Sequence, residues 1–491
     1  MTLSDFALAA EYPMIIQGGM GAGVSNWMLA RAVSLRGQLG VVSGTVIDTI
    51  FVRRLQDGDF GGHLRRAMEH FPCPAIAESA LARYFHPQGR APGVPYKALP
   101  TYKQVVSAAR QQITMLASFV EVWLAKEGHS NPVGINLLTK VQMPNLATLY
   151  GAMLAGVDVV LMGAGIPREI PGALDALAIH QPAAIRFDVE GGGDPEYLTF
   201  DPSEHGAMVV NLKRPKFFPI IAATSLATTL ARKANGRVDG FVIEGPTAGG
   251  HNAPPRGELK LSASGEPVYG ERDVVDLDKI RELGLPFWLA GGTGSPGGLR
   301  RALDAGAAGI QVGTLFAFSD ESGVVPELKE EVLAGVNRGD VNVRTDPRAS
   351  PTGYPFKLVE MAAGEYQSPT RQRICDLGYL RIAYRKEGGS LGYRCAAEPV
   401  DAYVAKGGTV EETEGRRCLC NALLANIGHA QVRPRWDDEL PLLTSGDDLM
   451  AMAPFLQGRT HYGAGEVLDY LLSGVTAGAT AAAASPPVAA V

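Results

Sequence analysis

The sequence predicts an α/β protein whose main body is a (β/α)8 TIM barrel, with insertions after strands 2 and 4 and a mainly helical and irregular C-terminal extension. Eight short apolar runs, each followed by a turn of small residues, lie before residue 315. Helical stretches separate most of these runs, and such alternation is typical of right-handed βαβ units. At 491 residues, the chain is long enough for a barrel of about 250 residues and a second module.

The eight runs are short, often β-branched and mostly continuous in hydrophobicity, as expected of parallel strands that are covered on both faces. Helices are expected between them, and a count of eight strands favours closure into a barrel. The expected strands are 13–17, 39–43, 133–137, 157–162, 218–222, 238–243, 286–290 and 309–312. The clearest expected helices are 26–35, 146–155, 226–234 and 298–305.

Two connections are too long to be simple crossovers, and both are expected on the catalytic face of the barrel. The insertion at about 46–131 contains helical material around a loop rich in Pro and Gly at 85–99. The insertion at about 166–217 contains extended segments at 183–189 and 197–200, separated by a glycine-rich turn. Both insertions could cover a substrate.

The βα rhythm stops after about residue 319. We therefore assign 1–330 to the barrel and 331–472 to a C-terminal extension. The segment 473–491, rich in Ala and Pro, is predicted to be a disordered tail, because it cannot bury enough apolar surface to offset its ordering entropy.

The composition is that of an ordinary soluble enzyme, with 46% hydrophobic residues, 20% charged residues and a net charge of −6. No basic excess supports contacts to a phosphate backbone, so we expect no nucleic acid partner. No run reaches the ~18 uninterrupted apolar residues of a membrane helix, and the first twelve residues do not resemble a signal peptide. We therefore predict a cytoplasmic protein without a membrane partner.

Glycine-rich turns follow the seventh and eighth strands. In TIM barrels these two loops form the common phosphate site, because glycine lets backbone N–H groups approach the anion. The two turns that we expect to bind a phosphate are 290–295 and 311–314. The alternative is that these glycines only form tight βα turns.

Small residues also follow other strands, and they would admit a large planar group to the barrel mouth. Gly18 and Gly19 follow the first strand, with Met20 placed to pack on such a group, and Gly163 ends the fourth. Asn136 lies in the otherwise apolar third strand, where its buried amide needs partners. A ligand or the protein itself could supply them.

His251 follows Gly249 and Gly250 at the end of the sixth strand, beside the expected phosphate site. A histidine with a pKa near ~6.5 is suited to moving a substrate proton at neutral pH. The two glycines leave its imidazole accessible. We interpret His251 as the catalytic residue, and a structural histidine is the alternative.

The extension holds four of the five cysteines, and a thiolate quartet can bind zinc or an iron–sulfur cluster. The spacing is not a standard one, so unrelated buried thiols are the alternative. The candidate ligands are Cys375, Cys395, Cys418 and Cys420.

These segments together resemble the nitronate monooxygenase (2-nitropropane dioxygenase) superfamily of FMN-dependent TIM-barrel oxidoreductases, which the FMN-dependent enoyl-ACP reductases share. The resemblance covers about residues 10–320, and its C-terminal extension makes the chain a longer form. It rests on 13–21, 134–136, 162–165, Glu244, 248–251, 290–292 and 311–314.

The resemblance implies FMN in the barrel mouth and identifies His251 with the family's catalytic histidine. The long insertions and the extension are similar to those of longer relatives that act beside polyketide or polyunsaturated fatty-acid synthases. The implied cofactor-binding residues are Gly18, Gly19, Met20, Asn136, Gly163, Gly249, Gly250, Gly292, Gly294, Gly313 and Thr314.

The leading hypothesis is an enzyme of the nitronate monooxygenase type, in which His251 abstracts a proton from an activated carbon and electrons pass to FMN and then to dioxygen. A second hypothesis is an NAD(P)H-dependent enoyl-thioester reductase acting beside a fatty-acid or polyketide synthase. A third, from another class, is a non-catalytic flavin- or cluster-binding partner. The substrate, a small molecule or a thioester, is left open, as are the electron donor and acceptor, a homodimer and a synthase partner.

Overall fold

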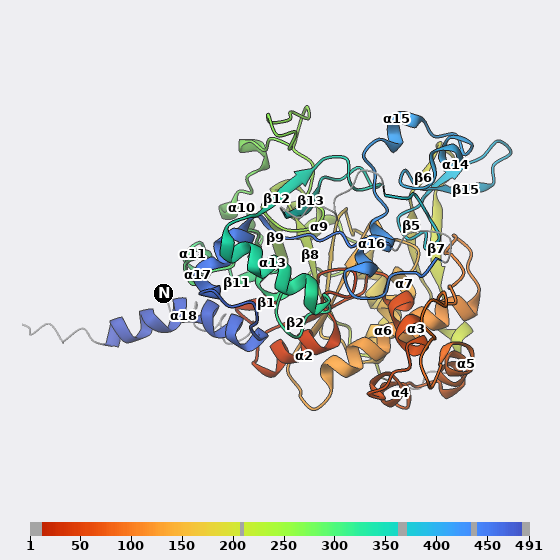
Figure 1. The fold of residues 1–491 in the computed structure, drawn as a ribbon, viewed down its shortest axis with the longest axis horizontal. Coiled ribbons are helices and arrows are strands. Elements are labelled where there is room, and N and C mark those ends of the chain that lie inside the picture. Colours follow the sequence, from red (N-terminus) through yellow and green to blue (C-terminus); the bar gives the residue numbers. More distant parts are fainter. Residues whose placement is uncertain (1–11, 207–210, 362–370, 434–438, 484–491) are drawn as a thin grey trace, which may run out of the picture.

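The eight predicted strands form one parallel sheet with the order β1-β11-β10-β9-β8-β4-β3-β2 (Figure 1). The computed structural model describes residues 12–206, 211–361, 371–433 and 439–483. The strands are β1 (Ile15–Gln17), β2 (Gly40–Ser43), β3 (Val133–Leu138), β4 (Val159–Gly163), β8 (Lys216–Ile221), β9 (Phe241–Glu244), β10 (Phe287–Ala290) and β11 (Gly309–Val312).

The sheet closes into the predicted barrel. The amide of Gln17 donates to the carbonyl of Leu39 at 2.9 Å, and the amide of Leu39 donates to the carbonyl of Ile15 at 3.1 Å. These bonds join β1 to the chain just before β2. The (β/α)8 prediction is therefore confirmed, since every strand of the sheet has two neighbours.

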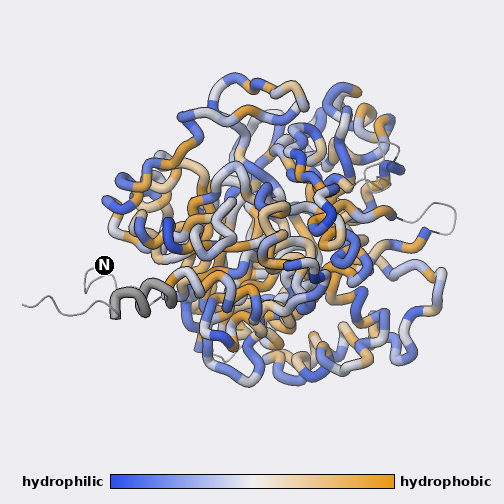
Figure 2. Tube along the Cα trace, turned by 60° about the vertical axis from the view of Figure 1, so that its left-hand side comes forward, coloured by the Kyte–Doolittle hydropathy of each residue, from blue (hydrophilic) through white to orange (hydrophobic). Residues whose placement is uncertain are grey.

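The barrel interior is filled by apolar side chains from alternate strand positions, as in a packed core. Trp288 of β10 is fully buried there, and its ring stacks on Phe218 of β8 with a centroid distance of 4.9 Å. Its indole N–H donates to the carbonyl of Pro13 at 2.9 Å. Figure 2 shows that the apolar segments gather at the centre of the molecule, with hydrophilic segments around them.

Helices pack outside the strands and connect them in sequence. Their apolar faces turn to the sheet; in α2, for example, Leu29, Ala30 and Val33 are buried. The connecting helices are α2 (Trp27–Leu35), α7 (Asn145–Leu154), α9 (Thr224–Lys233), α10 (Leu277–Arg281), α11 (Pro296–Asp304) and α12 (Thr314–Ala317).

Both expected insertions are present. The insertion after β2 holds α3 (Ile47–Gln56), α4 (His63–Met68), α5 (Pro74–Tyr84) and α6 (Ala108–Lys126). The insertion after β4 holds α8 (Ile170–Ala178) and the antiparallel strands β5 (Ala183–Phe187) and β7 (Glu196–Phe200), with β6 (Val189–Glu190) between them.

The C-terminal extension contains two β-hairpins, where the sequence predicted mainly helical and irregular structure. They are β12 (Val341–Asp346) with β13 (Phe356–Met361), and β14 (Ile382–Arg385) with β15 (Leu391–Arg394). Strand β14 also pairs with β6 of the second insertion. The helical elements are α13 (Pro326–Arg338), α14 (Val400–Val404), α15 (Val410–Thr413), α16 (Leu419–Ala425), the 3₁₀ turn η4 (Asp447–Met452), α17 (Ala453–Leu456) and α18 (Ala464–Ala483).

A buried polar cluster joins the extension to the first insertion. Arg110 of α6 and Asp48 of α3 form an ion pair with an N–O distance of 2.6 Å, and their side chains are 3% and 1% exposed. The hydroxyl of Tyr379 donates to the same carboxylate and lies 2.7 Å from the hydroxyl of Thr49. Burial works to raise the pKa of Asp48, but the Arg110 charge and the hydrogen bonds hold that pKa below its usual value.

The predicted tail at 473–491 needs a correction, because α18 continues as a helix to Ala483. Its Ala-rich sequence has high helix propensity, and Arg300 donates to the carbonyl of Gly474 at 2.9 Å, which ties its middle to α11. Residues 1–11 and 484–491, which include the rest of that tail, lie outside the described residues. Within the part of the chain that is described, no helix is long and apolar enough to cross a membrane.

Candidate active site

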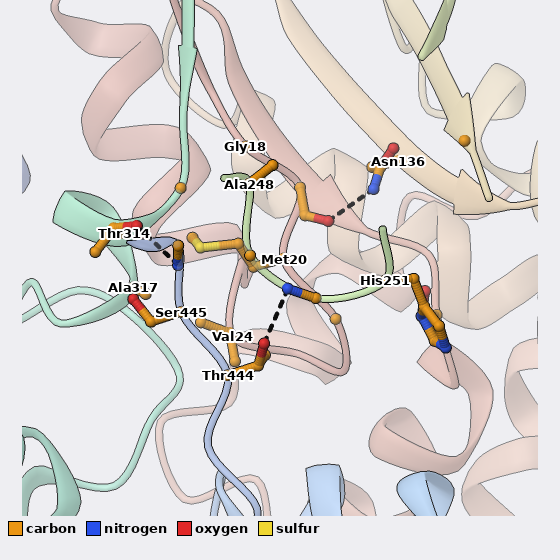
Figure 3. Close-up of a pocket in the computed structure, with 18 of the residues that line it drawn as sticks. Gly18, Met20, Val24, Asn136, Ala248, His251, Thr314, Ala317, Thr444 and Ser445 are labelled. Atoms are coloured by element: carbon orange, nitrogen blue, oxygen red, sulfur yellow. Dashed lines mark hydrogen bonds between the residues drawn. The ribbon is translucent and has the colours of Figure 1, made fainter. Parts of the chain in front are cut away.

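A cavity opens at the C-terminal ends of the barrel strands, and it brings together residues from all parts of the chain (Figure 3). Its volume is about 230 Å³. Most residues that the sequence singled out line it, although their binding roles stay predictions. These are Gly18, Gly19, Met20, Asn136, Gly163, Gly249, Gly250, His251, Gly294, Gly313 and Thr314.

Gly292 is the exception, because it does not line the cavity and is exposed to solvent. The preceding Gly291 has φ +89°, and its Cα lies so close to the backbone of Ala248 that an added Cβ would come within 2.9 Å of the Ala248 nitrogen. This tight turn directs the chain outward at Gly292. Gly291 therefore takes the place on the cavity wall that we expected for Gly292.

Two glycines are required by close packing around the cavity. A Cβ on Gly19 would lie 2.2 Å from the Cβ of Asn136, and a Cβ on Gly249 would lie 2.8 Å from the backbone carbonyl carbon of Ser445. Both contacts are too short for any side chain. The Asn136 amide instead donates to the carbonyl of Gly19 at 2.8 Å, which fixes its orientation beside β1.

His251 is held in place by the extension. Its backbone forms a β-bridge with Phe356, and its ring packs edge-on against the Phe356 ring with a centroid distance of 4.8 Å. The Nε2 atom lies 2.7 Å from the hydroxyl of the fully buried Ser350, which in turn lies 2.8 Å from the hydroxyl of Thr352. Burial, and then the charge of Lys140, lowers the pKa of His251 to about 4, so the imidazole is neutral at pH 7.

A second cavity, of about 190 Å³, adjoins the first on the other side of His251. The two share part of their lining, including His251 and Glu244. Tyr354 of the extension and Arg256 line the second cavity only. Burial raises the pKa of Glu244 to about 8, so this carboxyl is largely protonated at pH 7. The shared wall thus presents two neutral proton-transfer groups.

Residues 442–448, which we call the strap, cross the mouth of the barrel. The Thr444 hydroxyl accepts from the amide of Gly250 at 2.9 Å, and the amide of Asp447 donates to the carbonyl of Thr247 at 3.0 Å. The carboxylate of Asp447 also forms an ion pair, with an N–O distance of 2.6 Å, with Lys357, whose side chain is 1% exposed. These bonds fix the strap against the loop that carries His251.

The strap also contacts the loops after β10 and β11. The hydroxyl of Thr314 donates to Oδ1 of Asp448 at 2.6 Å and accepts from the amide of Gly446 at 3.2 Å. Gly294 also lies close to this carboxylate, because a Cβ added to Gly294 would come within 3.0 Å of Oδ2 of Asp448. The strap is thus bound to the segments that we predicted to hold a phosphate.

The cavity fits the ring of a flavin. Two buried acceptors on its wall, Oδ1 of Asn136 and Oε1 of Gln311, have no partner among the described residues, and such atoms need a donor from a ligand or water. An isoalloxazine ring presents N–H and C=O groups along one edge. A Cβ on Gly250 would meet no atom within 4 Å, so space remains beside the His251 loop.

The sequence interpretation missed the contribution of the extension to this cavity. The strap, Tyr379 and α16 supply much of the wall opposite the barrel. Only the small polar run from Thr444 to Asp448, which follows two leucines, marked the strap as a loop. Nothing in that run indicated which part of the barrel it would contact.

The four cysteines do not form the predicted metal site. No group of three or more His, Cys, Asp or Glu side chains is placed to bind a metal ion anywhere in the described residues. The Cys375 thiol contacts that of Cys395, and this contact with burial raises its pKa. Cys418 occupies the N-cap position of α16 without a side-chain capping bond, and Cys420 lines the cavity at the barrel mouth instead. All five cysteines are free thiols.

Comparison with known proteins supports the relationship that the sequence suggested. The family model of nitronate monooxygenase matches residues 196–345. A probable nitronate monooxygenase of Staphylococcus saprophyticus is 33% identical over 141 residues, which cover 28% of this chain and 38% of that protein. One from Bacillus subtilis is 31% identical over 148 residues, covering 30% and 40%. The chain thus spans less than half of the length of these relatives.

A relative that is named as a dehydrogenase matches a similar share of this chain. A (3aS,4S,5R,7aS)-5-hydroxy-7a-methyl-1-oxo-octahydro-1H-indene-4-carboxyl-CoA dehydrogenase of Mycobacterium tuberculosis is 30% identical over 128 residues, which cover 26% of this chain and 33% of that protein. Among solved structures, the enoyl reductase domain of MlnA from Bacillus amyloliquefaciens has a TM-score of 0.50 at 11% identity, covering 97% of this chain and 98% of that one. This likeness concerns the fold.

Proposed function

We propose that this chain, which is similar to nitronate monooxygenases over residues 196–345, is a flavin-dependent oxidoreductase in which His251 removes a proton from an activated substrate carbon. One observation carries the proposal: the neutral imidazole of His251 lies on the wall shared by two cavities. Of its two nitrogens, Nε2 forms a hydrogen bond with Ser350. No described residue donates to or accepts from Nδ1. That nitrogen is therefore available to a substrate.

The hydroxyls behind His251 suit it to act as a base. Ser350 can accept from Nε2–H while it donates to Thr352, whose hydroxyl also accepts from the amide of Tyr354 at 3.4 Å. In this arrangement Nδ1 carries the lone pair. When Nδ1 takes the substrate proton, the N–H···O bond to Ser350 stabilises the cation that forms, and the depressed pKa favours release of the proton afterwards.

Glu244 is the second group that we place in the chemistry. A protonated carboxyl can donate a hydrogen bond to a substrate oxygen that gains negative charge, as a nitro or carbonyl oxygen does when the neighbouring carbon loses its proton. Glu244 and His251 line the same two cavities, so one substrate can contact both. We therefore propose that Glu244 donates a hydrogen bond to the substrate oxygen and that His251 removes the proton from the neighbouring carbon.

A flavin, which is FMN in the family that the sequence resembles, is the cofactor that we propose, with its ring beside Gly18, Met20 and Asn136. A bound flavin supplies the two-electron oxidation of the substrate and returns the electrons to dioxygen. The residues of this chain position the ring and exclude water: Asn136 and Gln311 offer acceptors, and the strap covers the mouth of the barrel.

The second cavity favours a second candidate, an NAD(P)H-dependent reductase of enoyl thioesters. Two adjoining cavities can hold a substrate longer than a small nitroalkane, with its reacting carbon at His251. The relative named as a carboxyl-CoA dehydrogenase is consistent with such a substrate. In this candidate, His251 or Glu244 would give a proton instead of taking one.

The test begins with the absorption spectrum of the purified protein, which should show flavin bands. Under anaerobic conditions, a neutral nitroalkane, which still carries the proton that His251 would remove, should bleach these bands and air should restore them. His251→Gln should slow the bleaching by about 10²–10⁴-fold while flavin stays bound. His205→Gln, which changes another buried histidine, is the matched control and should leave the rate unchanged.

The electron donor distinguishes the candidates. Rapid bleaching by NADH or NADPH alone, with turnover of an enoyl thioester, would favour the reductase. A protein that binds flavin but reacts with neither donor, and whose His251→Gln variant behaves like the wild type, would contradict both candidates and favour a non-catalytic flavin-binding protein.

A further inference from the structure

The carboxylate of Asp448 occupies the position where the loops after β10 and β11 would bind a phosphate. Its Oδ1 accepts from the Thr314 hydroxyl at 2.6 Å, and its Oδ2 lies so close to Gly294 that a Cβ there would come within 3.0 Å of it. An anion that belongs to the chain itself thus accepts from the Thr314 hydroxyl and lies against Gly294, two residues of the expected phosphate site.

The strap holds this carboxylate in place from both sides. Gly446 donates to Thr314 at 3.2 Å, and a Cβ on Gly446 would come within 2.7 Å of Oδ1 of Asp448. Before it, the amide of Leu442 donates to the Asn426 side chain at 2.8 Å, and that side chain donates back to the Leu442 carbonyl at 2.8 Å. The segment that carries Asp448 is therefore bound along its length to the protein core.

Asp448 and its neighbour Asp447 differ in whether a cation lies beside the carboxylate. Asp447 has Lys357 as an ion-pair partner at 2.6 Å, whereas no described Lys, Arg or His forms an ion pair with Asp448. A second anion placed beside Asp448 would thus meet a negative charge that no cation neutralises.

We infer that Asp448 is a specificity-determining residue that acts against the 5′-phosphate of a flavin. The inference rests on the proposed function, because it assumes that the barrel binds a flavin ring. Riboflavin and FMN share that ring and differ in the phosphate. The carboxylate leaves the ring site available to both, and the phosphate of FMN must displace or approach Asp448 before it reaches Thr314 and Gly294.

The test compares the dissociation constants of riboflavin and FMN, measured by quenching of flavin fluorescence on the full-length protein after bound flavin has been removed. Wild-type protein should bind FMN less than about tenfold more tightly than riboflavin. Asp448→Asn keeps the shape and the acceptor oxygen but removes the charge. It should tighten FMN binding on the order of tenfold to a hundredfold and leave riboflavin within about threefold.

Asp448→Ala is the second variant, because it removes the side chain entirely and does not depend on how the amide packs. It should shift the FMN-to-riboflavin ratio in the same direction. Asp278→Asn, which changes an exposed carboxylate on α10 outside both cavities, is the matched control and should leave the ratio unchanged.

Two results would overturn the inference while the proposed function stands. One is wild-type protein that binds FMN more than about a hundredfold more tightly than riboflavin. The other is an Asp448→Asn or Asp448→Ala variant whose FMN-to-riboflavin ratio equals that of the wild type. Failure of both flavins to bind to wild type and variants would instead overturn the proposed function, and this inference with it.

Discussion

His251 should remain neutral far below the pH at which an ordinary histidine becomes charged. Burial and the Lys140 charge lower its pKa from 6.5 to about 4, which corresponds to about 3.4 kcal/mol against the imidazolium. At pH 5.5, a histidine with a pKa of 6.5 is about one-tenth neutral. With a pKa of about 4, it is about 97% neutral.

Exchange of the histidine C2–H with deuterium measures this directly, because its rate follows the protonation state and peptide mass spectrometry resolves each histidine. The midpoint for the peptide that contains His251 should lie between about pH 4 and 5 in the folded protein, and near 6.5 in denaturant. Lys140→Gln should raise the folded midpoint by less than one unit, because burial is the larger cause. A folded midpoint above pH 6 would refute the reasoning.

The same shift affects stability. The unfolded chain binds a proton on His251 between about pH 6.5 and pH 4, and the folded protein does not, so acidification through this window favours unfolding. The melting temperature of the wild type should therefore fall more between pH 7 and pH 5 than that of His251→Gln. Equal falls in the two proteins would contradict a depressed pKa.

Two further predictions concern packing. Arg110→Met leaves the buried carboxylate of Asp48 without its cation and should lower the free energy of unfolding by about 3–5 kcal/mol in urea titrations. Arg36→Met, at an exposed ion pair, is the control and should lower that free energy by less than about 1 kcal/mol. Equal losses in the two variants would contradict a special contribution of the buried pair. Gly249→Ala puts a Cβ 2.8 Å from the strap backbone and should weaken flavin binding measured by fluorescence. Gly245→Ala, whose added Cβ would have its nearest atom at 3.6 Å, is the control and should not weaken it. Equal flavin affinities of the two variants would show that the strap moves to accommodate the added methyl group.

The barrel could be predicted because its signals are local. Each strand is a short apolar run with its own turn, and the register follows once eight of them close in order. The loops that carry His251, Gly294 and Thr314 could be placed on one face for the same reason, since parallel strands bring their C-terminal ends together. Gly292, which does not line the cavity, follows a turn whose direction depends on the contact between Gly291 and Ala248.

The extension could not be predicted in the same way. Four cysteines close in sequence suggested a metal site, but Cys418 and Cys420 lie at the start of one helix while Cys375 contacts Cys395, so no cluster forms among the described residues. Ala-rich sequence near the C-terminus suggested disorder, but helix propensity and a contact to α11 extend α18 to Ala483.

The barrel, the face that we expect to carry the chemistry and His251 as the candidate base could all be inferred from local patterns in the chain. The surroundings of that base became known only from the packing of distant segments. Ser350 lies 99 residues from His251, and Asp448 lies 134 residues from Thr314. Contacts over such separations depend on how the extension packs across the barrel mouth, and no periodicity or spacing along the chain encodes that packing.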